Sequence, residues 1–374
     1  MDRCDVLVVG GGPAGSTCAW RLGLAGFDVV VLDRATFPRD KVCAGWITPA
    51  VVEALKLDLG RYGATRTLQP FTGFRCSLMH GDPRPIDFGR IISYGVRRRE
   101  FDAYLLERSR ARVLAGEPLV DLRRDGAGWI ANGRLRASLV VGAGGHFCPV
   151  ARDLNAGARH AEEVVVAQEI EFPLLDATSR ATPVRDGVPD LFFWPDLMGY
   201  GWCVRKGAYL NVGAGRLARS GFPAAMREFV AMLEARDMLP EEAPRSWKGH
   251  AYLLNRTARR RVHDDGRLLV GDAAGLALAP SGEGILAAVE SGSMAADTIR
   301  DACGDFRHQR LASYERRIVE RFGPRARAVS RPPSLPAWLI AAAARAVFHS
   351  RRLTRRLIVE DGMLHLRRPS LRRE

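Results

Sequence analysis

The chain has 374 residues, 47% of them hydrophobic, so its length and composition predict about two globular domains and exclude global disorder. Its net charge of +14 lies mostly in residues 305–374, which hold 17 arginines and 6 acidic residues, yet no zinc-finger spacing or aromatic-interleaved basic patch indicates nucleic-acid binding. Seven scattered cysteines without a C-x-x-C pair argue against a disulfide framework or a metal site and, with no apolar run of ~18 residues, favour a cytoplasmic protein.

The amino end alternates between apolar runs and a glycine-rich turn. DVLVVG (5–10) predicts a buried strand, GGPAGSTCAWRLGLAG (11–26) a turn and a helix, and DVVVLDR (28–34) a second strand. This order predicts a βαβ unit with a parallel sheet.

The turn carries the spacing G-x-G-x-x-G. Gly10 permits a tight turn, Gly12 lets a pyrophosphate approach the backbone, and Gly15 allows close packing of the helix on the strand. Asp33 ends the second strand, where a carboxylate can accept hydrogen bonds from a ribose hydroxyl pair. The pattern predicts a dinucleotide site with the phosphates at the helix N-terminus.

The elements that follow differ in their hydrophobic period. Residues 95–112 have Phe101, Tyr104 and Leu105 at helical spacing, which predicts an amphipathic helix. SLVVGAGG (138–145) and RLLVGDAAG (267–275) predict further buried strands. The β-rich stretches between these elements, with a helix at 222–239, predict an antiparallel sheet in a second domain.

The stretch GDAAGLALAPSGEGI (271–285) follows an apolar strand and precedes an alanine-rich helical segment. Asp272 can bind a sugar-like polyol, and Ser281–Gly284 can present bare N–H groups at the start of the helix. These donors and the helix dipole would stabilise the negative charge of a reduced flavin, which favours FAD over NAD. The alternative interpretation is that Asp272 caps a helix and the glycines form an ordinary loop.

These patterns predict an α/β fold: a Rossmann-type FAD-binding domain with an inserted antiparallel β-sheet substrate domain and a helical basic C-terminal tail. The predicted ranges are 1–70, 95–155 and 262–303 for the FAD-binding domain, 71–94 and 156–261 for the substrate domain, and 304–374 for the C-terminal segment.

Five segments carry a more specific signal. They are GGGPAGSTCAWRLGLAGFDVVVLDR, FPRDKVCAGWITPAVVEAL, VRRREFDAYLLE, GYGWCVRKGAYLNVGAG and LLVGDAAGLALAPSGEGILAAVESG. In this order they resemble the geranylgeranyl reductase family, within the superfamily of FAD-dependent aromatic hydroxylases and flavin-dependent halogenases. The resemblance covers roughly residues 5–300 by motif, and it implies a two-domain FAD fold with a β-sheet roof above the flavin.

The resemblance also implies roles for individual residues. The residues implied to hold FAD are Gly10, Gly12, Gly15, Asp33 and Arg34 at the ADP half, Arg98 near the phosphates or ribose, Gly271 and Asp272 at the ribityl chain, and Gly282 and Gly284 at the ring. Cys43 matches the family's cysteine beside the flavin pocket, although most free cysteines are simply small buried hydrophobes. Tyr200 and Trp202 resemble the aromatic pair that lines a lipid-accepting cavity, and the alternative is that they are core residues of a sheet.

Three departures from the superfamily pattern bear on function. Gly144 replaces the acid of the usual G-A-D-G, which argues against direct docking of NAD(P)H and favours a separate electron donor, such as a reductase or a ferredoxin. Val204–Arg205 replaces the family's Phe-Pro, which predicts a more polar or anionic substrate end. The halogenase motif W-x-W-x-I-P is missing, which disfavours halogenation.

The tail contains a second apolar piece, LPAWLIAAAA (335–344), followed by an arginine-rich stretch. As one helix it places Leu339, Ala343, Ala346, Leu353 and Leu357 on a common face, with Arg345, Arg352 and Arg356 beside it. Such a helix either lies on anionic lipid, so that 335–374 makes peripheral membrane contact, or packs against the FAD-binding domain.

The leading hypothesis is an FAD-dependent oxidoreductase that reduces carbon–carbon double bonds of an isoprenoid or lipid-like hydrophobic substrate, with Cys43 as a candidate proton donor. The alternative is an FAD-dependent monooxygenase, a hydroxylase or epoxidase, acting on an aromatic or polyketide substrate. Both use the same cofactor site, so the sequence separates them poorly.

Overall fold

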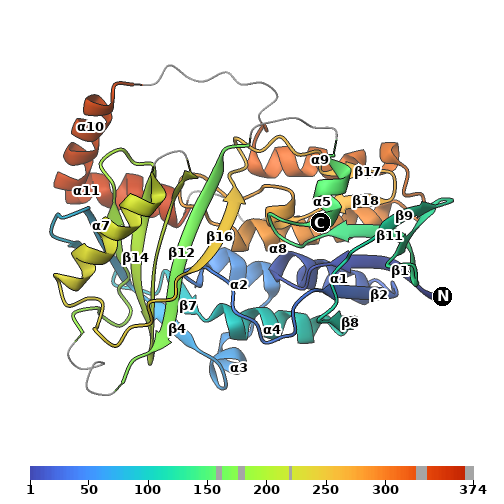
Figure 1. The fold of residues 1–374 in the computed structure, drawn as a ribbon, viewed down its shortest axis with the longest axis horizontal. Helices are drawn as coiled ribbons and strands as arrows, with labels where there is room; N and C mark the ends of the chain where they lie inside the picture. The colour runs from blue at the N-terminus through green and yellow to red at the C-terminus, as the bar shows by residue number, and fades with distance from the viewer. Residues whose placement is uncertain (157–161, 176–181, 219–220, 326–334, 367–374) are drawn as a thin grey trace.

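The computed structural model describes residues 1–156, 162–175, 182–218, 221–325 and 335–366. Within these residues the strands form an eight-stranded, a seven-stranded and a three-stranded sheet. The first two lie at opposite ends of the molecule (Figure 1). Residues 367–374, the end of the predicted basic tail, lie outside the described residues.

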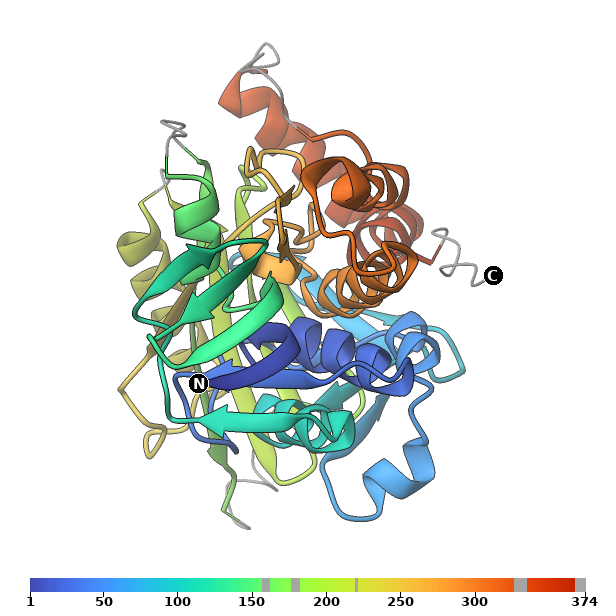
Figure 2. The same cartoon turned by 90° about the vertical axis from the view of Figure 1, so that its right-hand side faces the viewer.

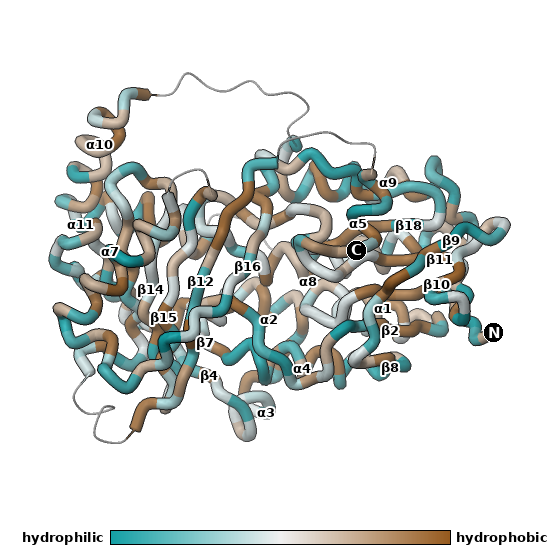
Figure 3. Tube along the Cα trace, viewed as in Figure 1, coloured by the Kyte–Doolittle hydropathy of each residue, from teal (hydrophilic) through white to brown (hydrophobic). Residues whose placement is uncertain are grey.

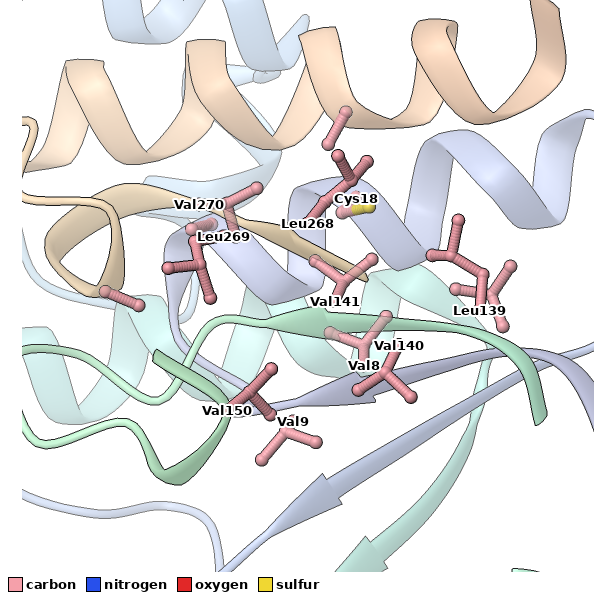
Figure 4. Packing of buried hydrophobic residues seen from close by; sticks show 14 of the residues in the cluster. Val8, Val9, Cys18, Leu139, Val140, Val141, Val150, Leu268, Leu269 and Val270 are labelled. Atoms are coloured by element: carbon pink, nitrogen blue, oxygen red, sulfur yellow. The ribbon is translucent and has the colours of Figure 1, made fainter. Parts of the chain in front are cut away.

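The first sheet is built on the predicted βαβ unit. Its strands, in spatial order, are β17 (His263–Asp264), β18 (Arg267–Leu269), β11 (Leu135–Gly142), β1 (Asp2–Val9), β2 (Val29–Asp33) and β8 (Arg112–Ala115), with β9 (Leu122–Asp125) and β10 (Gly128–Ala131) attached beside β11. β1 pairs in parallel with both β2 and β11. Valine and leucine runs fill these strands because both faces of the sheet are covered (Figure 4).

Helices α1 (Pro13–Leu24), α8 (Ile285–Asp301) and α9 (His308–Phe322) cover one face of this sheet. Figure 2 shows the orange C-terminal helices α8 and α9 beside the blue and green strands. α8 approaches α1 closely because Gly292 has no side chain: a Cβ there would lie 2.4 Å from the Ala14 carbonyl oxygen. Tyr314 of α9 donates a hydrogen bond to Leu269 O at 2.7 Å, so the first part of the 304–374 segment packs in this core.

The second sheet is mainly antiparallel, as predicted. Its order is β16 (Lys248–Leu253), β12 (Val164–Pro173), β15 (Tyr209–Leu217), β14 (Gly199–Lys206), β13 (Asp190–Phe193), β5 (Gly73–Leu78) and β6 (Arg84–Asp87), with β13 and β5 paired in parallel. Helix α7 (Phe222–Glu234) covers one face through Phe229, which is fully buried. The helix predicted at 222–239 therefore exists and ends at Glu234.

The remaining elements join the two large sheets. They are β3 (Trp46–Ile47), α2 (Pro49–Leu55), α3 (Leu59–Gly63), β4 (Leu68–Phe71), β7 (Ser93–Val96), α4 (Arg98–Ser109), α5 (Pro149–Leu154) and the short turn η2 (Gly271–Ala273). The helix predicted at 95–112 begins only at Arg98, because Gly95 pairs with Trp46 and Gln69 in the three-stranded sheet.

The tail corrects one prediction. It forms α10 (Ala337–His349), α11 (Arg351–Leu353) and η3 (Thr354–Met363) rather than a single helix. Ser350 is extended (φ −98°, ψ 111°) and its side chain caps the next turn by accepting from Leu353 N at 3.4 Å. The break separates Leu339 from Leu353 and Leu357, so the predicted common face does not form. Among the described residues, no helix has the length and apolarity to cross a bilayer.

Candidate functional site

A cavity of about 700 Å³ lies between the two large sheets, within the range of small-molecule and cofactor sites. Its wall combines the turn after β1, the segment 39–48, strands β14 and β16, and the loop before α8. Predicted site residues in this wall are Gly10, Gly12, Asp33, Arg34, Cys43, Arg98, Tyr200, Trp202, Asp272, Gly282 and Gly284.

The turn after β1 leaves its backbone open to one end of the cavity. Gly10 has φ +115°, and a Cβ on Gly15 would lie 1.9 Å from Gly10 O, so both glycines are required by the turn and by helix packing. Gly12 differs, because its backbone is extended and the nearest atom to a Cβ would be Arg39 Nη2 at 3.4 Å. The fold therefore does not require glycine at position 12, but the missing side chain leaves space in the cavity.

Asp33 is fixed at the end of β2. Its Oδ2 accepts from Gly11 N at 2.7 Å and its Oδ1 accepts from Ala35 N at 2.9 Å. The carboxylate thus links the strand end to the glycine turn while lining the cavity. A carboxylate at this point of a βαβ unit is the group that binds ribose in dinucleotide-binding folds.

Two basic side chains lie near Asp272 in the cavity wall. His250 Nε2 lies 3.3 Å from Asp272 Oδ2, and Lys41 lines the same wall. Burial alone would raise the pKa of Asp272, but the hydrogen bond from His250 and the charge of Lys41 lower it to about 2. Burial lowers the pKa of Lys41 to about 8. Asp272 is therefore a carboxylate at neutral pH and can accept hydrogen bonds from a polyol.

The loop before α8 is shaped by two tyrosines. Tyr200 Oη donates to Ser281 O at 2.6 Å, and a Cβ on Gly282 (φ +71°) would lie 2.2 Å from Tyr252 Oη. Gly284 is the N-cap residue of α8, a helix of 17 residues. The first N–H groups of such a helix have no intrahelical acceptor and favour negative charge in the cavity.

Arg98 connects Cys43 to the helix α4. It is 8% exposed and bonds both oxygens of Asp102, at 2.8 and 2.9 Å. Burial alone would lower the pKa of Arg98, but the charges of Asp102 and Cys43 and hydrogen bonds to both raise it overall. The Arg98 guanidinium therefore stays charged and lies beside Cys43.

Aromatic side chains line the other end of the cavity. Tyr200 and Trp202 of β14 lie with ring centroids 6.0 Å apart, and Trp46, Tyr252 and Met363 line the same wall. Trp202 Nε1 donates to Asn211 Oδ1 at 2.7 Å, which fixes the indole ring. The two predicted aromatics thus face the cavity as well as packing in the sheet, so this end suits an apolar molecule.

Two predicted residues do not line the cavity. Gly15 lies beneath the turn, and Gly271 lies between α1 and α8, where a Cβ would be 3.0 Å from Ala14 Cβ. Arg205 does not line it either, because its Nε bonds Asp186 Oδ1 at 2.9 Å. The Val204–Arg205 departure therefore brings no charge into the cavity, and the substrate polarity predicted from it has no support here.

Sequence reasoning missed Lys41, His250, Tyr252 and Met363 as cavity residues. Lys41 lies two positions before Cys43 and could have been found from that segment. His250 and Tyr252 alternate along β16, which only shows that they share a face. The structure also describes no group of three or more His, Cys, Asp or Glu side chains that could hold a metal, among the residues it covers.

A buried polar cluster lies under the Cys43 segment. Glu169 Oε2 accepts from Cys43 N at 2.7 Å and from Asn211 Nδ2 at 3.2 Å. Lys206, which is fully buried, binds Glu171 Oε1 at 2.5 Å and donates to Ala44 O at 3.1 Å. These bonds tie the Cys43 segment to the second sheet.

Glu169 makes stability depend on pH. Burial raises its pKa to about 7, so the folded protein holds a proton there that the unfolded chain releases near pH 4.5. Wild-type stability therefore falls as pH rises from about 4.5 through about 7. We expect Glu169→Gln to gain about 2–3 kcal/mol relative to wild type between pH 4.5 and pH 8. Denaturant unfolding of wild type and Glu169→Gln at both pH values measures this gain. If the stability difference between the two proteins were the same at both pH values, the prediction would be contradicted.

Comparison with known proteins places this cavity in context. The family described as FAD dependent oxidoreductase matches residues 5–79. A menaquinone reductase from Mycobacterium tuberculosis is 33% identical over 327 residues, which cover 80% of this chain and 77% of that protein. A digeranylgeranylglycerophospholipid reductase from Methanothrix thermoacetophila is 29% identical over 357 residues, which cover 86% and 84%.

A solved structure shares the fold. The crystal structure of a geranylgeranyl bacteriochlorophyll reductase-like protein from Thermoplasma acidophilum matches with a TM-score of 0.73 at 23% identity, covering 86% of this chain and 85% of that one. The predicted combination of a Rossmann-type domain and an antiparallel sheet is confirmed by this match and by the two sheets described above.

Proposed function

This chain belongs to the geranylgeranyl reductase family of FAD-dependent oxidoreductases, and from that membership we propose that it reduces carbon–carbon double bonds of an isoprenoid or similar lipid-like substrate. The observation that carries the proposal is one continuous cavity, with a glycine turn and two carboxylates at one part and an aromatic wall at the other. The names of the two relatives, both reductases, support reduction over oxygenation.

The residues present fit FAD. Gly12 leaves open the space that a pyrophosphate needs, Asp33 is placed for a ribose, and Asp272 is placed for a polyol chain. The N-terminus of α8, at Gly284, would favour a reduced, negatively charged ring. When bound, FAD supplies the hydride that a double-bond reduction requires.

The chain's own residues then hold the substrate and supply a proton. Tyr200 and Trp202 would contact the apolar body of the substrate and exclude water. Cys43 is our candidate for the group that gives a proton to the second carbon of the double bond, because it lines the cavity and the Arg98 cation lies beside it.

Electron supply is a separate part of the proposal. Gly144 lies in the cavity wall at the position where the superfamily usually has an acid, so we propose that a separate donor, a reductase or a ferredoxin, reduces the flavin. Dithionite should then bleach the purified flavoprotein while NADPH does not. Rapid bleaching by NADPH would overturn this part without affecting the reductase proposal.

The test of the function is anaerobic turnover. Enzyme reduced with dithionite and mixed with a polyprenyl substrate such as menaquinone should add two hydrogens to a double bond of the polyprenyl chain without oxygen. Because dithionite also reduces the quinone ring, the product is reoxidised in air before its mass is measured, and a reaction without enzyme is the control. A monooxygenase, the alternative hypothesis, would be inactive without oxygen and would add an oxygen atom in its presence. Product formation that requires oxygen would therefore decide for the alternative.

The same assay tests Cys43. We expect Cys43→Ala to slow product formation by about 100-fold, the usual contribution of a positioned proton donor, while FAD content stays the same. Cys303→Ala is the matched control, because Cys303 is an exposed free cysteine distant in sequence from the cavity residues. Equal rates for wild type and Cys43→Ala would remove the thiol from the mechanism.

A further inference from the structure

The tail presents an apolar surface to solvent on and just before α10. Leu335, Trp338 and Leu339 are exposed to 60%, 72% and 38%; Trp338 and Leu339 lie in the first turn of α10, and Leu335 lies just before it. Ala344 and Phe348 of the same helix are buried. α10 therefore contacts the body of the protein through these two residues, while Leu335, Trp338 and Leu339 stay exposed. Figure 3 shows α10 at one end of the molecule, coloured by hydropathy.

Exposed arginines follow the apolar residues along the tail, one on α10 and three after the break at Ser350. They are Arg345, Arg351, Arg352 and Arg356. In the described part of the tail, Arg355 pairs with Glu360 at 2.8 Å, whereas these four arginines form no salt bridge to a described residue. Exposed arginines and exposed apolar side chains in one segment are the combination with which interfacial segments bind anionic lipid.

α10 is held firmly in this position. The ring centroids of Phe348 and Phe193 lie 5.1 Å apart, and Arg84 Nη1 donates to His349 O at 2.6 Å. Thr354 Oγ1 donates to Val347 O at 2.9 Å, which fixes α10 to the turn that follows it. α10 lies at one end of the molecule (Figure 1).

The same segment leads to the cavity. At the end of η3, Met363 lines the cavity wall, and His365 Nε2 and Ser281 Oγ are joined by a hydrogen bond of 3.0 Å. Ser281 belongs to the loop before α8, so the tail contacts the loop that would face the flavin ring. The tail thus connects the exposed surface to the cavity.

We propose that the α10 surface, defined as Leu335, Trp338, Leu339 and the four arginines named above, binds the protein to anionic lipid bilayers. The three apolar side chains insert among the headgroups and the arginines contact lipid phosphates. Anionic lipid is the occupant favoured here because the surface combines apolar area with unpaired positive charge. That this contact delivers substrate to the cavity rests on the proposed function, whereas binding itself does not.

The experiment is sedimentation of the FAD-loaded protein with vesicles. Wild type should bind vesicles of phosphatidylglycerol and phosphatidylcholine, bind pure phosphatidylcholine far more weakly, and lose binding at high salt. Leu335→Ser/Trp338→Ser/Leu339→Ser should weaken binding to the mixed vesicles by at least about 10-fold. Replacing the four arginines by glutamine should weaken it by about 100-fold or more.

Matched controls keep the result interpretable. Val120→Ser removes an apolar side chain that is 78% exposed elsewhere, and replacing four other exposed arginines by glutamine produces the same change in net charge. These four are Arg123, Arg300, Arg307 and Arg310. The controls should bind like wild type, with the flavin spectrum and melting temperature reporting folding in every variant.

Failure of wild type to sediment with the mixed vesicles would overturn the proposal, as would equal binding by wild type and the α10 variants. Because vesicle binding needs no turnover, this outcome differs from failure of the reductase assay. Binding without anaerobic reduction would contradict the proposed function alone.

Discussion

Replacing Gly12 by valine is expected to abolish FAD binding while leaving the apoprotein folded. Gly12 is extended (φ −74°, ψ −177°), a conformation that valine adopts readily, and its Cβ would have no neighbour closer than 3.4 Å. The side chain would instead occupy the part of the cavity where the pyrophosphate is proposed to lie. We expect FAD affinity to fall by at least about 100-fold, or about 2.7 kcal/mol, in a fluorescence titration.

Two other glycines make this result specific. Gly249→Val is the control, since a Cβ there would meet nothing within 4 Å and the residue is exposed on β16. Gly15→Val should instead destabilise the fold, because its Cβ would lie 1.9 Å from Gly10 O. Normal FAD binding by Gly12→Val would show that the cofactor does not lie against this turn.

Replacing Lys206 by methionine should lower stability by about 3 kcal/mol. Lys206 is fully buried, and Gly45 and Gly95 make room for it: a Cβ on either would lie within 2.9 Å of its side chain. Methionine keeps most of the volume but leaves Glu171 in the interior without its closest cation. Arg97, 3.2 Å from Glu171, retains part of the pairing, which sets the effect at the lower end for a broken buried pair.

Denaturant unfolding would measure this loss against two controls. Lys248→Met removes the cation of an exposed pair with Asp40 and should change stability by no more than about 1 kcal/mol. Lys206→Met/Glu171→Leu should recover part of the loss, because it removes the uncompensated charge as well. A Lys206→Met protein as stable as wild type would mean that the cluster does not hold the Cys43 segment in place.

Local patterns in the sequence were sufficient to predict the cofactor end of the cavity. The glycine turn and Asp33 lie within one βαβ unit, and Asp272 follows a strand of the same sheet, so their positions depend on neighbouring residues and on parallel pairing. The second sheet was also predictable, because its segments are rich in β-branched and aromatic residues. The roles of these residues toward FAD stay predictions.

Other parts of the cavity wall depend on contacts between distant segments. His250 reaches Asp272 only because β16 pairs with β12 at the edge of the second sheet. Met363 reaches the cavity only because the tail breaks at Ser350 and turns back along the protein. Helical spacing alone predicts a continuous helix there, since Ser350 is a weak local signal and the packing of Phe348 decides the course of the chain.

The central claim is that the cavity between the two sheets binds FAD. Absorption spectroscopy of the purified wild-type protein, with the released cofactor identified by mass, tests it most directly. The account predicts a yellow protein with one FAD per chain. A colourless protein that takes up no FAD at micromolar concentration would contradict it.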